Sequence, residues 1–419
     1  MANQRLKESK YNLIVKNGIN NYIVHNMLTK NTVLLNTKEL RLLKSMSNDD
    51  FNVKFVELGF LVNVNFDEVK HAVDENVIAC NDLSYLNVTL IPSFGCNLRC
   101  GYCYQNGSEI KKISREAQEG FIKFVKKRLL DCKSTSFHLS WFGGEPLLFF
   151  DVVKSVSLKI KDFCERNSIS FSSSISSNLT LFEENMIETF KDINITRIET
   201  TLAGLEKEHN KLRPASNSVN SFQKTFDSIF VVSRWFITMV NINFCKENYC
   251  SIKKLIKLLV KKQGQKLYVN FNEILNYKQN RRQYRQFKNT EKIKMKLFSF
   301  ALKNELRICD VTNFCGGSMF CPQYHANSFA IDSELNVYKC TERCDATNRY
   351  GKIEYKTGEL NVFNKNKSGL INSCMSCQFL PYCNGGCEIK RQLHEKPCPA
   401  ELDSVDKYLQ IFVKKKNSE

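Results

Sequence analysis

The sequence of 419 residues has no apolar run long enough to cross a bilayer, and its start, MANQRLKESK, lacks the apolar stretch of a secretory signal. It also shows no serine–histidine–aspartate order, no phosphate-binding glycine loop and no pair of catalytic carboxylates. Nothing therefore supports export, membrane insertion or a hydrolytic mechanism of those kinds, and we expect a cytoplasmic protein. The six histidines are isolated and are expected to be structural or surface residues: His25, His71, His138, His209, His325 and His394.

Eighteen cysteines are unusual for a chain without an export signal. The cytosol keeps thiols reduced, so clustered cysteines there indicate metal ligands or catalytic groups more than disulfides. Eleven of the eighteen fall into spaced motifs. The other seven are scattered, and we interpret them as mostly buried small apolar residues: Cys80, Cys132, Cys164, Cys245, Cys250, Cys309 and Cys344.

The net charge of +18 is compatible with a nucleic acid, an acidic peptide or a membrane surface as partner. No segment interleaves aromatic and basic residues as nucleic-acid-binding segments do, so nucleic acid ranks last, and no membrane partner is assigned. Lysine and asparagine are abundant throughout, which a compositional bias of the source would also produce. The most basic stretch, residues 278–296, is predicted to be a solvated helix face.

Between residues 87 and 271, short β-type runs alternate with longer helical ones, which predicts a parallel sheet covered by helices. Six such units indicate an α/β fold, a partial (β/α)6 TIM-like barrel, whose chemistry is expected at the C-terminal ends of the strands. The predicted strands are residues 88–93, 136–142, 169–175, 195–202, 236–244 and 266–271.

The length and the changes of pattern predict three domains. Residues 1–86 are expected to form a small winged-helix-like unit, with a hairpin around Asn17 and Gly18 followed by two helical stretches. Residues 87–308 form the barrel with a helical linker. Residues 309–419 are rich in cysteine and weakly periodic, so we expect metal binding to hold them together.

The motif CNLRCGYC, residues 96–103, directly follows the first predicted strand. Three thiolates can hold a four-iron cluster and leave one iron open, whereas closed iron–sulfur and structural zinc sites take four ligands. No fourth cysteine or histidine lies nearby, so Cys96, Cys100 and Cys103 predict a site that accepts a ligand. Tyr102 is expected to lie over that ligand. The alternative is three unrelated cysteines in a loop.

This spacing, with an aromatic residue before the third cysteine, resembles the signature of radical S-adenosylmethionine (SAM) enzymes. The resemblance implies a [4Fe–4S] cluster and SAM as cofactors. It extends to WFGGEP, residues 141–146, in which Gly143, Gly144, Glu145 and Pro146 are similar to the segment that binds the methionyl amino group.

Two further segments resemble the family but depart from its pattern. Asn178 matches the Thr-Asn-Gly motif after the third strand, although Leu179 replaces the glycine. The segment TTLAGLEKEHNKLR resembles the peptide-modifying branch, which implies that Thr201 and Arg213 bind the SAM ribose and carboxylate. Ala203 stands where that branch has aspartate, so any role of that carboxylate is absent or moved here.

The C-terminal cysteines resemble the SPASM domain, which holds two auxiliary [4Fe–4S] clusters and brings the expected total to three. The resemblance assigns the nearer auxiliary cluster to Cys315, Cys321, Cys340 and Cys387. It assigns the farther cluster to Cys374, Cys377, Cys383 and Cys398. Leu335 is a departure, because it replaces the glycine found five residues before Cys340. A pair of zinc sites with four thiolates each is the alternative.

The resemblance implies a radical SAM peptide maturase with an N-terminal leader-recognition unit in residues 1–86. Such an enzyme uses a 5′-deoxyadenosyl radical to abstract hydrogen from a ribosomally made precursor peptide and installs an intramolecular C–C, ether or thioether cross-link. Full ligation of the nearer auxiliary cluster leaves no place for a substrate thiol, which favours a non-thioether bond. The expected partners are a precursor peptide with its leader and an external electron donor of the flavodoxin or ferredoxin type. No catalytic side chain is assigned.

Two other functions are compatible with these motifs. An anaerobic sulfatase-maturing enzyme, which forms formylglycine, has similar cysteine spacing, but such enzymes carry aspartate where Thr341 follows Cys340 and have no long N-terminal extension. A non-catalytic iron–sulfur electron carrier has no need of the SAM-binding segment at residues 143–146. The motifs therefore favour the peptide maturase.

Overall fold

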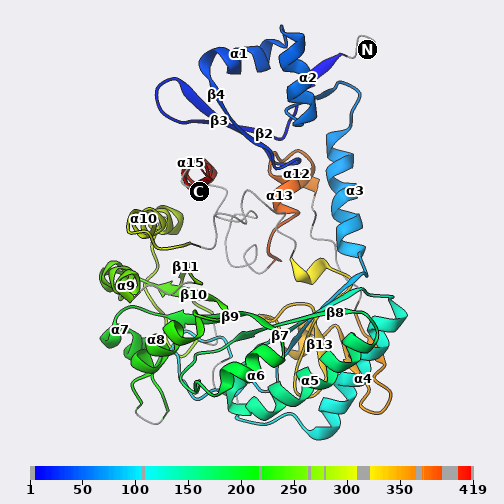
Figure 1. Ribbon diagram of the computed structural model, residues 1–419, viewed down its shortest axis with the longest axis vertical. Helices are drawn as coiled ribbons and strands as arrows, with labels where there is room; N and C mark the ends of the chain where they lie inside the picture. The colour runs from blue at the N-terminus through cyan, green and yellow to red at the C-terminus, as the bar shows by residue number, and fades with distance from the viewer. Residues whose placement is uncertain are drawn as a thin grey trace. The chain divides into compact units, whose positions relative to one another are not determined.

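The computed structural model describes residues 5–105, 109–216, 219–262, 266–277, 280–308, 321–364, 370, 372–388 and 404–416 (Figure 1). The chain divides into two compact units. One comprises Met1–Asn81, Asp310–His325 and Lys367–Glu419, and the other comprises Asp82–Cys309 and Ala326–Asn366. No described helix has both the length and the apolar character needed to cross a membrane.

The second unit is built on a sheet whose first six strands run parallel and in chain order, which confirms the predicted α/β partial barrel. Each parallel pair is joined by a helical connection, as parallel strands require. The first strand was predicted at residues 88–93, whereas the observed strand begins and ends three residues earlier in the sequence. The bounds predicted for the other five strands lie within two residues of the observed ones. The strands are β6 (Tyr85–Leu90), β7 (Ser136–Trp141), β8 (Ser170–Ser176), β9 (Ile195–Leu202), β10 (Ile237–Phe244) and β11 (Leu267–Glu273).

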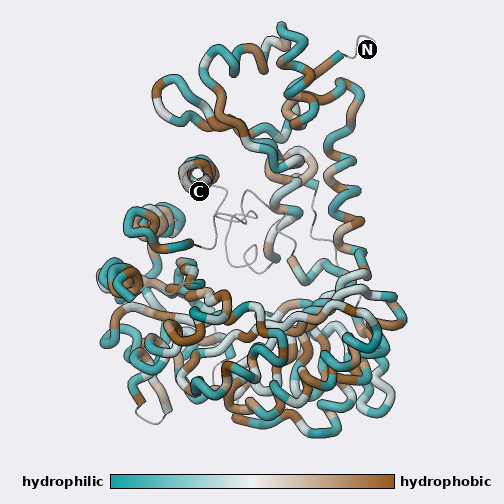
Figure 2. Tube along the Cα trace, viewed as in Figure 1, coloured by the Kyte–Doolittle hydropathy of each residue, from teal (hydrophilic) through white to brown (hydrophobic). Residues whose placement is uncertain are grey.

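Helices cover this sheet, and Figure 2 shows hydrophobic residues alternating with hydrophilic ones along them. In the first helix the Ser114 hydroxyl accepts a hydrogen bond from the Ala117 N–H, and Phe121, Phe124 and Leu129 are buried against the sheet as their spacing predicts. The helices are α4 (Arg115–Asp131), η1 (Pro146–Phe149), α5 (Phe150–Arg166), α6 (Met186–Asp192), α7 (Glu206–Leu212), α8 (Ser221–Val232), α9 (Tyr249–Lys262) and α10 (Thr290–Lys303).

The sheet continues beyond β6 through residues that follow the barrel in sequence. Strand β12 (Ser328–Ile331) pairs parallel with β6, and three antiparallel strands extend the edge from it. This pairing places residues 326–366 with the barrel, so the predicted range 309–419 is divided between the two units. The added strands are β13 (Asn336–Tyr338), β14 (Gly351–Ile353) and β15 (Leu360–Val362), with η3 (Ala346–Asn348) between β13 and β14.

Leu335 occupies the turn between β12 and β13 with a φ of 59°, the left-handed conformation that glycine adopts most easily. The side chain is fully buried. The Asp332 carboxylate fixes this turn by accepting hydrogen bonds from the Asn336 N–H (2.9 Å) and the Tyr338 hydroxyl (3.0 Å). The chain therefore holds a leucine in the left-handed conformation, at a cost of about 1–2 kcal/mol.

The first unit begins with a three-stranded antiparallel sheet in the order β2-β3-β4. The predicted hairpin around Asn17 and Gly18 is confirmed, as are the two helical stretches after it. The core of this part includes Val24, Leu43 and Phe60. The elements are β1 (Leu6–Glu8), β2 (Asn12–Lys16), β3 (Asn21–Asn26), β4 (Thr32–Asn36), α1 (Thr37–Ser45), α2 (Asp49–Glu57), β5 (Leu61–Asn63) and α3 (Glu68–Asn81).

The same unit includes C-terminal segments that pack on these N-terminal elements. Helix α13 lies beside α3, and the last helix lies beside β3 (Figure 1). The C-terminal elements of this unit are η2 (Pro322–Tyr324), α12 (Asn372–Met375), α13 (Leu380–Cys383) and α15 (Val405–Lys416).

Candidate functional site

The cysteine loop, residues 91–105, follows the C-terminal end of β6 and is hydrogen-bonded to the end of α7 and the segment after it. The Arg99 N–H donates to the Pro214 carbonyl (2.8 Å), and the Gly101 N–H donates to the Leu212 carbonyl (3.1 Å). The three thiols of Cys96, Cys100 and Cys103 are half-buried in this loop. The backbone thus holds all three at the strand ends, where the fold predicts the chemistry.

Burial makes two of these thiols hard to ionise. It raises the pKa of Cys96 to about 12, with a further contribution from the Glu145 carboxylate, and the pKa of Cys103 to about 11, with a contribution from Cys100. A cation is therefore needed to stabilise the thiolates at neutral pH, as metal binding does when it releases the thiol protons. Among the described residues, no three His, Cys, Asp or Glu side chains are arranged to hold a single metal ion.

Gly143 and Gly144 let the chain after β7 pack directly on the cysteine loop. Gly143 has a φ of +126°, and a Cβ there would lie 2.4 Å from the Ser93 carbonyl oxygen. A Cβ on Gly144 would lie 2.1 Å from the Gly95 carbonyl oxygen. The two glycines therefore allow the backbone of residues 143–144 to contact the backbone of the cysteine loop. This contact places the second sequence motif, residues 141–146, directly beside the first, residues 96–103.

Glu145 carries a buried carboxylate that accepts three hydrogen bonds from neutral donors. These come from the Ser177 hydroxyl (2.8 Å), the Leu147 N–H (2.9 Å) and the Asn178 N–H (2.7 Å). Burial raises the pKa of Glu145, and the hydrogen bonds from Asn178, Leu147 and Ser177 oppose that rise. A buried carboxylate of this kind favours a cationic group beside it. Pro146 follows as the first residue of η1.

Asn178 connects the end of β8 with the cysteine loop. Its Nδ2 donates to the Asn97 Oδ1 (2.9 Å) and lies 3.7 Å from the Cys96 Sγ. Leu179, which replaces the family's glycine, has a φ of 58° and is fully buried. As at Leu335, a buried leucine holds a left-handed backbone conformation here.

Arg213 is a buried cation beside Tyr102. Its guanidinium, in a residue only 7% exposed, donates to the Tyr102 hydroxyl (3.2 Å), which also accepts from the Asn243 Nδ2 (3.5 Å). The Arg213 Nε is buried and has no hydrogen-bond partner among the described residues. Burial also raises the pKa of Tyr102. The arrangement places a positive charge next to the loop that carries the three thiols.

Ala203 lies in a buried apolar cluster with Leu212, Cys245 and Ile274, against which Tyr102 packs. The position where the peptide-modifying branch has aspartate is thus an apolar wall in this chain. Thr201, two residues earlier on β9, pairs in register with Asn241 of β10 and is half-buried.

Residues 278–296, the most basic stretch, were predicted to form a solvated helix face, and this prediction is wrong for the residues before Thr290. Helix α10 begins at Thr290, and the residues before it form a loop that contacts the cysteine loop. The Arg282 N–H donates to the Gly101 carbonyl (3.0 Å), and the Tyr284 ring packs edge-on against Tyr102 at 6.3 Å between centroids. Because such contacts join residues far apart in sequence, no spacing rule pointed to Tyr284. Residues 278–279 lie outside the described part of the chain.

Three of the histidines that were expected to be structural form hydrogen bonds within the fold, although the Nε2 atoms of His25 and His209 are buried without a partner among the described residues. His25 contacts the Thr32 hydroxyl (2.8 Å), His138 contacts the Ser172 and Ser174 hydroxyls, and His209 accepts from the Ala203 N–H.

The predicted cysteine ligands of the auxiliary clusters fall into both units. Cys340 follows β13 in the barrel unit, where the Tyr104 hydroxyl donates to the adjacent Thr341 carbonyl (3.4 Å). Cys321, Cys374, Cys377, Cys383 and Cys387 belong to the other unit. Cys315 and Cys398, like Cys309, lie outside the described residues.

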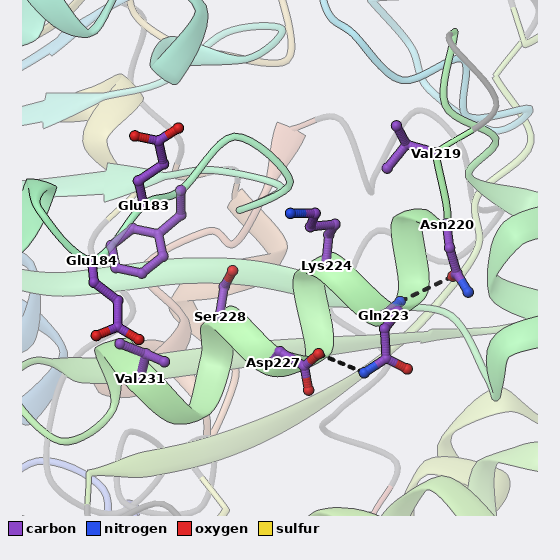
Figure 3. A pocket seen from close by; sticks show the side chains of 10 residues that line it. Glu183, Glu184, Val219, Asn220, Gln223, Lys224, Asp227, Ser228 and Val231 are labelled. Atoms are coloured by element: carbon purple, nitrogen blue, oxygen red, sulfur yellow. Dashed lines mark hydrogen bonds between the residues drawn. The ribbon is translucent and has the colours of Figure 1, made fainter.

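A pocket of about 460 Å³ lies elsewhere on the barrel unit, between α8 and the loop after β8 (Figure 3). Glu183 and Glu184 line one side, and Gln223, Lys224 and Asp227 line the other. None of the predicted cofactor or metal residues lines it.

The residues at the strand ends fit the cofactors that the resemblance implies. Glu145 and Arg213 are a buried anion and a buried cation, and neither forms an ion pair within the described residues. Together they match a ligand with one amino and one carboxylate group, as the methionyl part of SAM has. The three half-buried thiols match a metal centre that stabilises thiolates.

The chain is similar to known proteins in sequence. Residues 90–259 match the Radical SAM superfamily. The chain is 26% identical over 341 residues to a cysteine-type anaerobic sulfatase-maturating enzyme of Clostridium novyi (strain NT), a match that covers 72% of this chain and 87% of the relative.

Two solved structures share the fold at low sequence identity. Native anSMEcpe with bound AdoMet and Cp18Cys peptide superposes with a TM-score of 0.60 at 19% identity, covering 80% of this chain and 98% of its own. Streptococcus suis SuiB superposes with a TM-score of 0.52 at 15% identity, covering 93% of this chain and 97% of its own.

Proposed function

We propose that this chain, whose residues 90–259 match the Radical SAM superfamily, is a peptide maturase that cross-links a ribosomally made precursor peptide. The observation that carries the proposal is the folded N-terminal sheet and helices, an element beyond the barrel that suits peptide binding. The proposed cofactors are SAM and three [4Fe–4S] clusters, with an external flavodoxin or ferredoxin as electron donor.

The residues at the strand ends take complementary roles in this proposal. Cys96, Cys100 and Cys103 hold the cluster that binds SAM, and Glu145 and Arg213 hold the SAM amino and carboxylate groups. When bound, SAM and the reduced cluster supply a 5′-deoxyadenosyl radical, which removes a hydrogen atom from the substrate. Gly143, Gly144 and Pro146 shape the segment that carries Glu145, and Tyr102, Asn178 and Thr201 complete the pocket.

A cross-link removes two hydrogens from the peptide. One leaves as the abstracted atom and appears in 5′-deoxyadenosine, and the other leaves as a proton together with an electron. The auxiliary clusters of the C-terminal cysteines are the proposed acceptors of that electron. The apolar wall around Ala203 suits a reaction that must exclude water from a reactive radical.

Among the described residues, nothing pairs with the outer edge of β4 in the N-terminal sheet, which leaves that edge for a leader peptide. The other edge, β2, is covered: the Gln378 Nε2 donates to the Asn12 carbonyl (2.5 Å) and the Gln410 Nε2 donates to the Lys16 carbonyl (3.0 Å). On β4, the Leu34 side chain is 47% exposed. We therefore assign leader binding to β4, where an extended peptide can add as a further strand.

Replacing Leu34 with proline should weaken binding of the precursor leader about tenfold. The Asn26 N–H donates to the Asn31 carbonyl, and in an antiparallel pair the backbone groups of alternate residues point to the neighbouring strand. The N–H of Val33 therefore points toward β3, and the N–H of Leu34 points to the outer edge. Proline at Leu34 thus removes a donor from the free edge and leaves the ladder to β3 intact. Fluorescence anisotropy with a labelled leader measures the effect.

The matched control is Leu34→Ala, which shortens the side chain but keeps the N–H. It should bind the leader within a few-fold of the unsubstituted protein. Equal affinities for Leu34→Pro and the unsubstituted chain would show that the leader does not add to β4.

Formylglycine formation is the second candidate, favoured by the match to the sulfatase-maturating enzyme of Clostridium novyi. The solved anSMEcpe structure holds AdoMet and a peptide, so a peptide or protein substrate suits both candidates. Thr341 stands where the sulfatase-maturing enzymes carry aspartate, which argues against formylglycine.

Co-expression with a candidate precursor peptide, sought among the neighbouring open reading frames, separates the two candidates. The proposal expects a peptide that has lost two hydrogens, that resists reaction with a hydroxylamine probe and whose fragments stay joined in tandem mass spectrometry. A product that captures the aldehyde probe would instead establish formylglycine.

The proposal also places the enzyme in the cytoplasm. Eleven of the eighteen cysteines lie in motifs with the spacing of metal ligands, and thiolate ligands of this kind suit a reducing compartment.

A further inference from the structure

Part of the most basic stretch of the sequence lies against the cysteine loop, and the proposed function gives its charges no role. Residues 280–289 form a loop before α10 in the barrel unit. The Asn276 side chain holds Tyr284 by two hydrogen bonds, donating to its carbonyl (2.8 Å) and accepting from its N–H (2.9 Å). The Phe287 N–H donates to the Glu273 carboxylate at the end of β11 (2.7 Å). The barrel therefore holds this basic loop in place.

The basic loop contacts the cysteine loop through Arg282. The Arg282 N–H donates to the Gly101 carbonyl (3.0 Å), and a Cβ on Gly101 would lie 3.5 Å from the Arg282 Cδ. Arg99 lies two residues before Gly101 in the cysteine motif. Burial raises the pKa of the Cys103 thiol to about 11, and the positive charge of Arg281 opposes this rise. Three arginines thus lie around the loop that carries the three thiols.

These arginines present positive charge that the fold leaves unbalanced. Arg99, Arg281 and Arg282 are exposed, and none of them forms an ion pair with a described residue. The carboxylate of Glu247 is already paired with Arg285 (2.9 Å). A guanidinium keeps its charge at any physiological pH. We call Arg99, Arg281 and Arg282 the basic surface.

We propose that the basic surface docks the acidic protein that supplies electrons at the cysteine loop, a carrier of the flavodoxin or ferredoxin type. This inference rests on the proposed function, in which Cys96, Cys100 and Cys103 hold a cluster and an external donor reduces it. In the docked pair one electron passes across the interface, so the donor is oxidised by one electron and the cluster is reduced by one. No bond forms or breaks in this step.

An acidic electron carrier fits the basic surface in charge and in position. Electron transfer between proteins slows steeply as the two redox centres move apart, so the donor has to dock beside the loop that holds the cluster. Electron-transfer complexes bury little surface and are steered together by opposite charges, so a few unpaired arginines suffice. A nucleic acid fits less well, because Tyr284, the aromatic residue among these arginines, packs against Tyr102 and is not free to stack on a base.

The test starts with binding of the full-length protein to an immobilised bacterial flavodoxin, measured by biolayer interferometry at low ionic strength. The double variant Arg281→Gln/Arg282→Gln should bind about tenfold more weakly, because two charges that attract the acidic partner are lost. Arg281→Lys/Arg282→Lys keeps both charges and should retain most of the affinity. Added salt should weaken binding of the unsubstituted protein more than binding of the glutamine double variant.

A second readout separates docking from SAM cleavage. With flavodoxin and its NADPH-dependent reductase as electron source, the glutamine double variant should release 5′-deoxyadenosine about tenfold more slowly at limiting flavodoxin. With excess dithionite it should match the unsubstituted protein, because the substitutions keep the Arg282 N–H and its bond to Gly101.

The matched control is Lys133→Gln/Arg234→Gln, which also removes two exposed positive charges. Lys133 and Arg234 lie in the turns before β7 and β10, at the opposite ends of the parallel strands from the cysteine loop. The control should match the unsubstituted protein in flavodoxin binding and with both electron sources.

An unsubstituted protein that cleaves SAM with excess dithionite but does not bind flavodoxin would overturn the inference alone. Equal flavodoxin binding by the glutamine double variant and the unsubstituted protein would do the same. If the double variant instead lost affinity for a single-stranded oligonucleotide and kept flavodoxin binding, the basic surface would belong to nucleic acid and the inference would be wrong. An unsubstituted protein that releases no 5′-deoxyadenosine even with dithionite would overturn the proposed function, and the binding comparison would still decide the docking surface.

Discussion

Replacing Cys100 with alanine should remove about four iron atoms per chain and reduce SAM cleavage to background. The loss is complete because only two thiolates, those of Cys96 and Cys103, would remain for a cluster that already has one iron without a protein ligand. The Cys100 loop is pinned by backbone hydrogen bonds from Arg99 and Gly101, so the fold around the substitution should persist. Iron and sulfide quantification on anaerobically purified protein, with chromatographic detection of 5′-deoxyadenosine, measures both effects.

Cys250→Ala is the matched control, because Cys250 is an exposed free cysteine on α9 of the same unit. It should retain the full iron content and the full rate of SAM cleavage. If Cys100→Ala kept its iron, the three cysteines of the loop would not be cluster ligands. Stoichiometric zinc in place of iron would contradict the assignment as well.

Replacing Arg213 with leucine should weaken SAM binding by about 2–5 kcal/mol, which is at least about thirtyfold. Arg213 is the buried cation of the site, and its free Nε is a donor that the SAM carboxylate would satisfy. The hydrogen bond to Tyr102 orients the guanidinium and would be lost with it. Isothermal titration calorimetry with SAM under anaerobic conditions measures the affinity.

Arg197→Leu is the control for a general loss of charge, because Arg197 lies on β9 in an exposed pair with Glu199. It should bind SAM as the unsubstituted protein does. Circular dichroism should show that Arg213→Leu keeps its secondary structure, since leucine fills most of the space of the lost side chain. Unchanged SAM affinity in that folded variant would remove Arg213 from the pocket.

The barrel was predictable because its signal is local. Alternation of β-type and helical runs identified six strands in the correct order, and the apolar stripe of α4 identified the helix face on the sheet. The pairing of β12 with β6 was not predictable, since these strands are far apart in sequence and four-residue β12 carries little pattern of its own. For the same reason the predicted C-terminal domain did not anticipate that its two parts join different units.

Site residues that belong to a contiguous sequence motif could be predicted. Site residues that the fold brings together from distant parts of the sequence could not. Cysteine spacing marked the loop, and Gly143 and Gly144 marked a close approach, but the sequence did not show that the approach is to the cysteine loop itself. Asn243 and Tyr284, which contact Tyr102, were missed because neither belongs to a spaced motif. Both leucines that replace family glycines, Leu179 and Leu335, proved to keep a positive φ, which no propensity rule predicts for leucine.

Residues 372–388 contact the start of the N-terminal sheet, and this packing affects how leader recognition is tested. Removing residues 1–86 would expose Gln378 and the backbone around Met375 at the same time as it removed β4. Weaker peptide binding in such a truncated chain would not separate the two effects. The single substitution Leu34→Pro avoids this difficulty.

The most direct measurement of the central claim is the cleavage of SAM by the reconstituted full-length protein. Incubated anaerobically with SAM and a strong reductant, the protein should release 5′-deoxyadenosine and methionine, and deuterium from a labelled precursor peptide should appear in the nucleoside. A protein that carries a full complement of iron yet releases no 5′-deoxyadenosine would contradict the account.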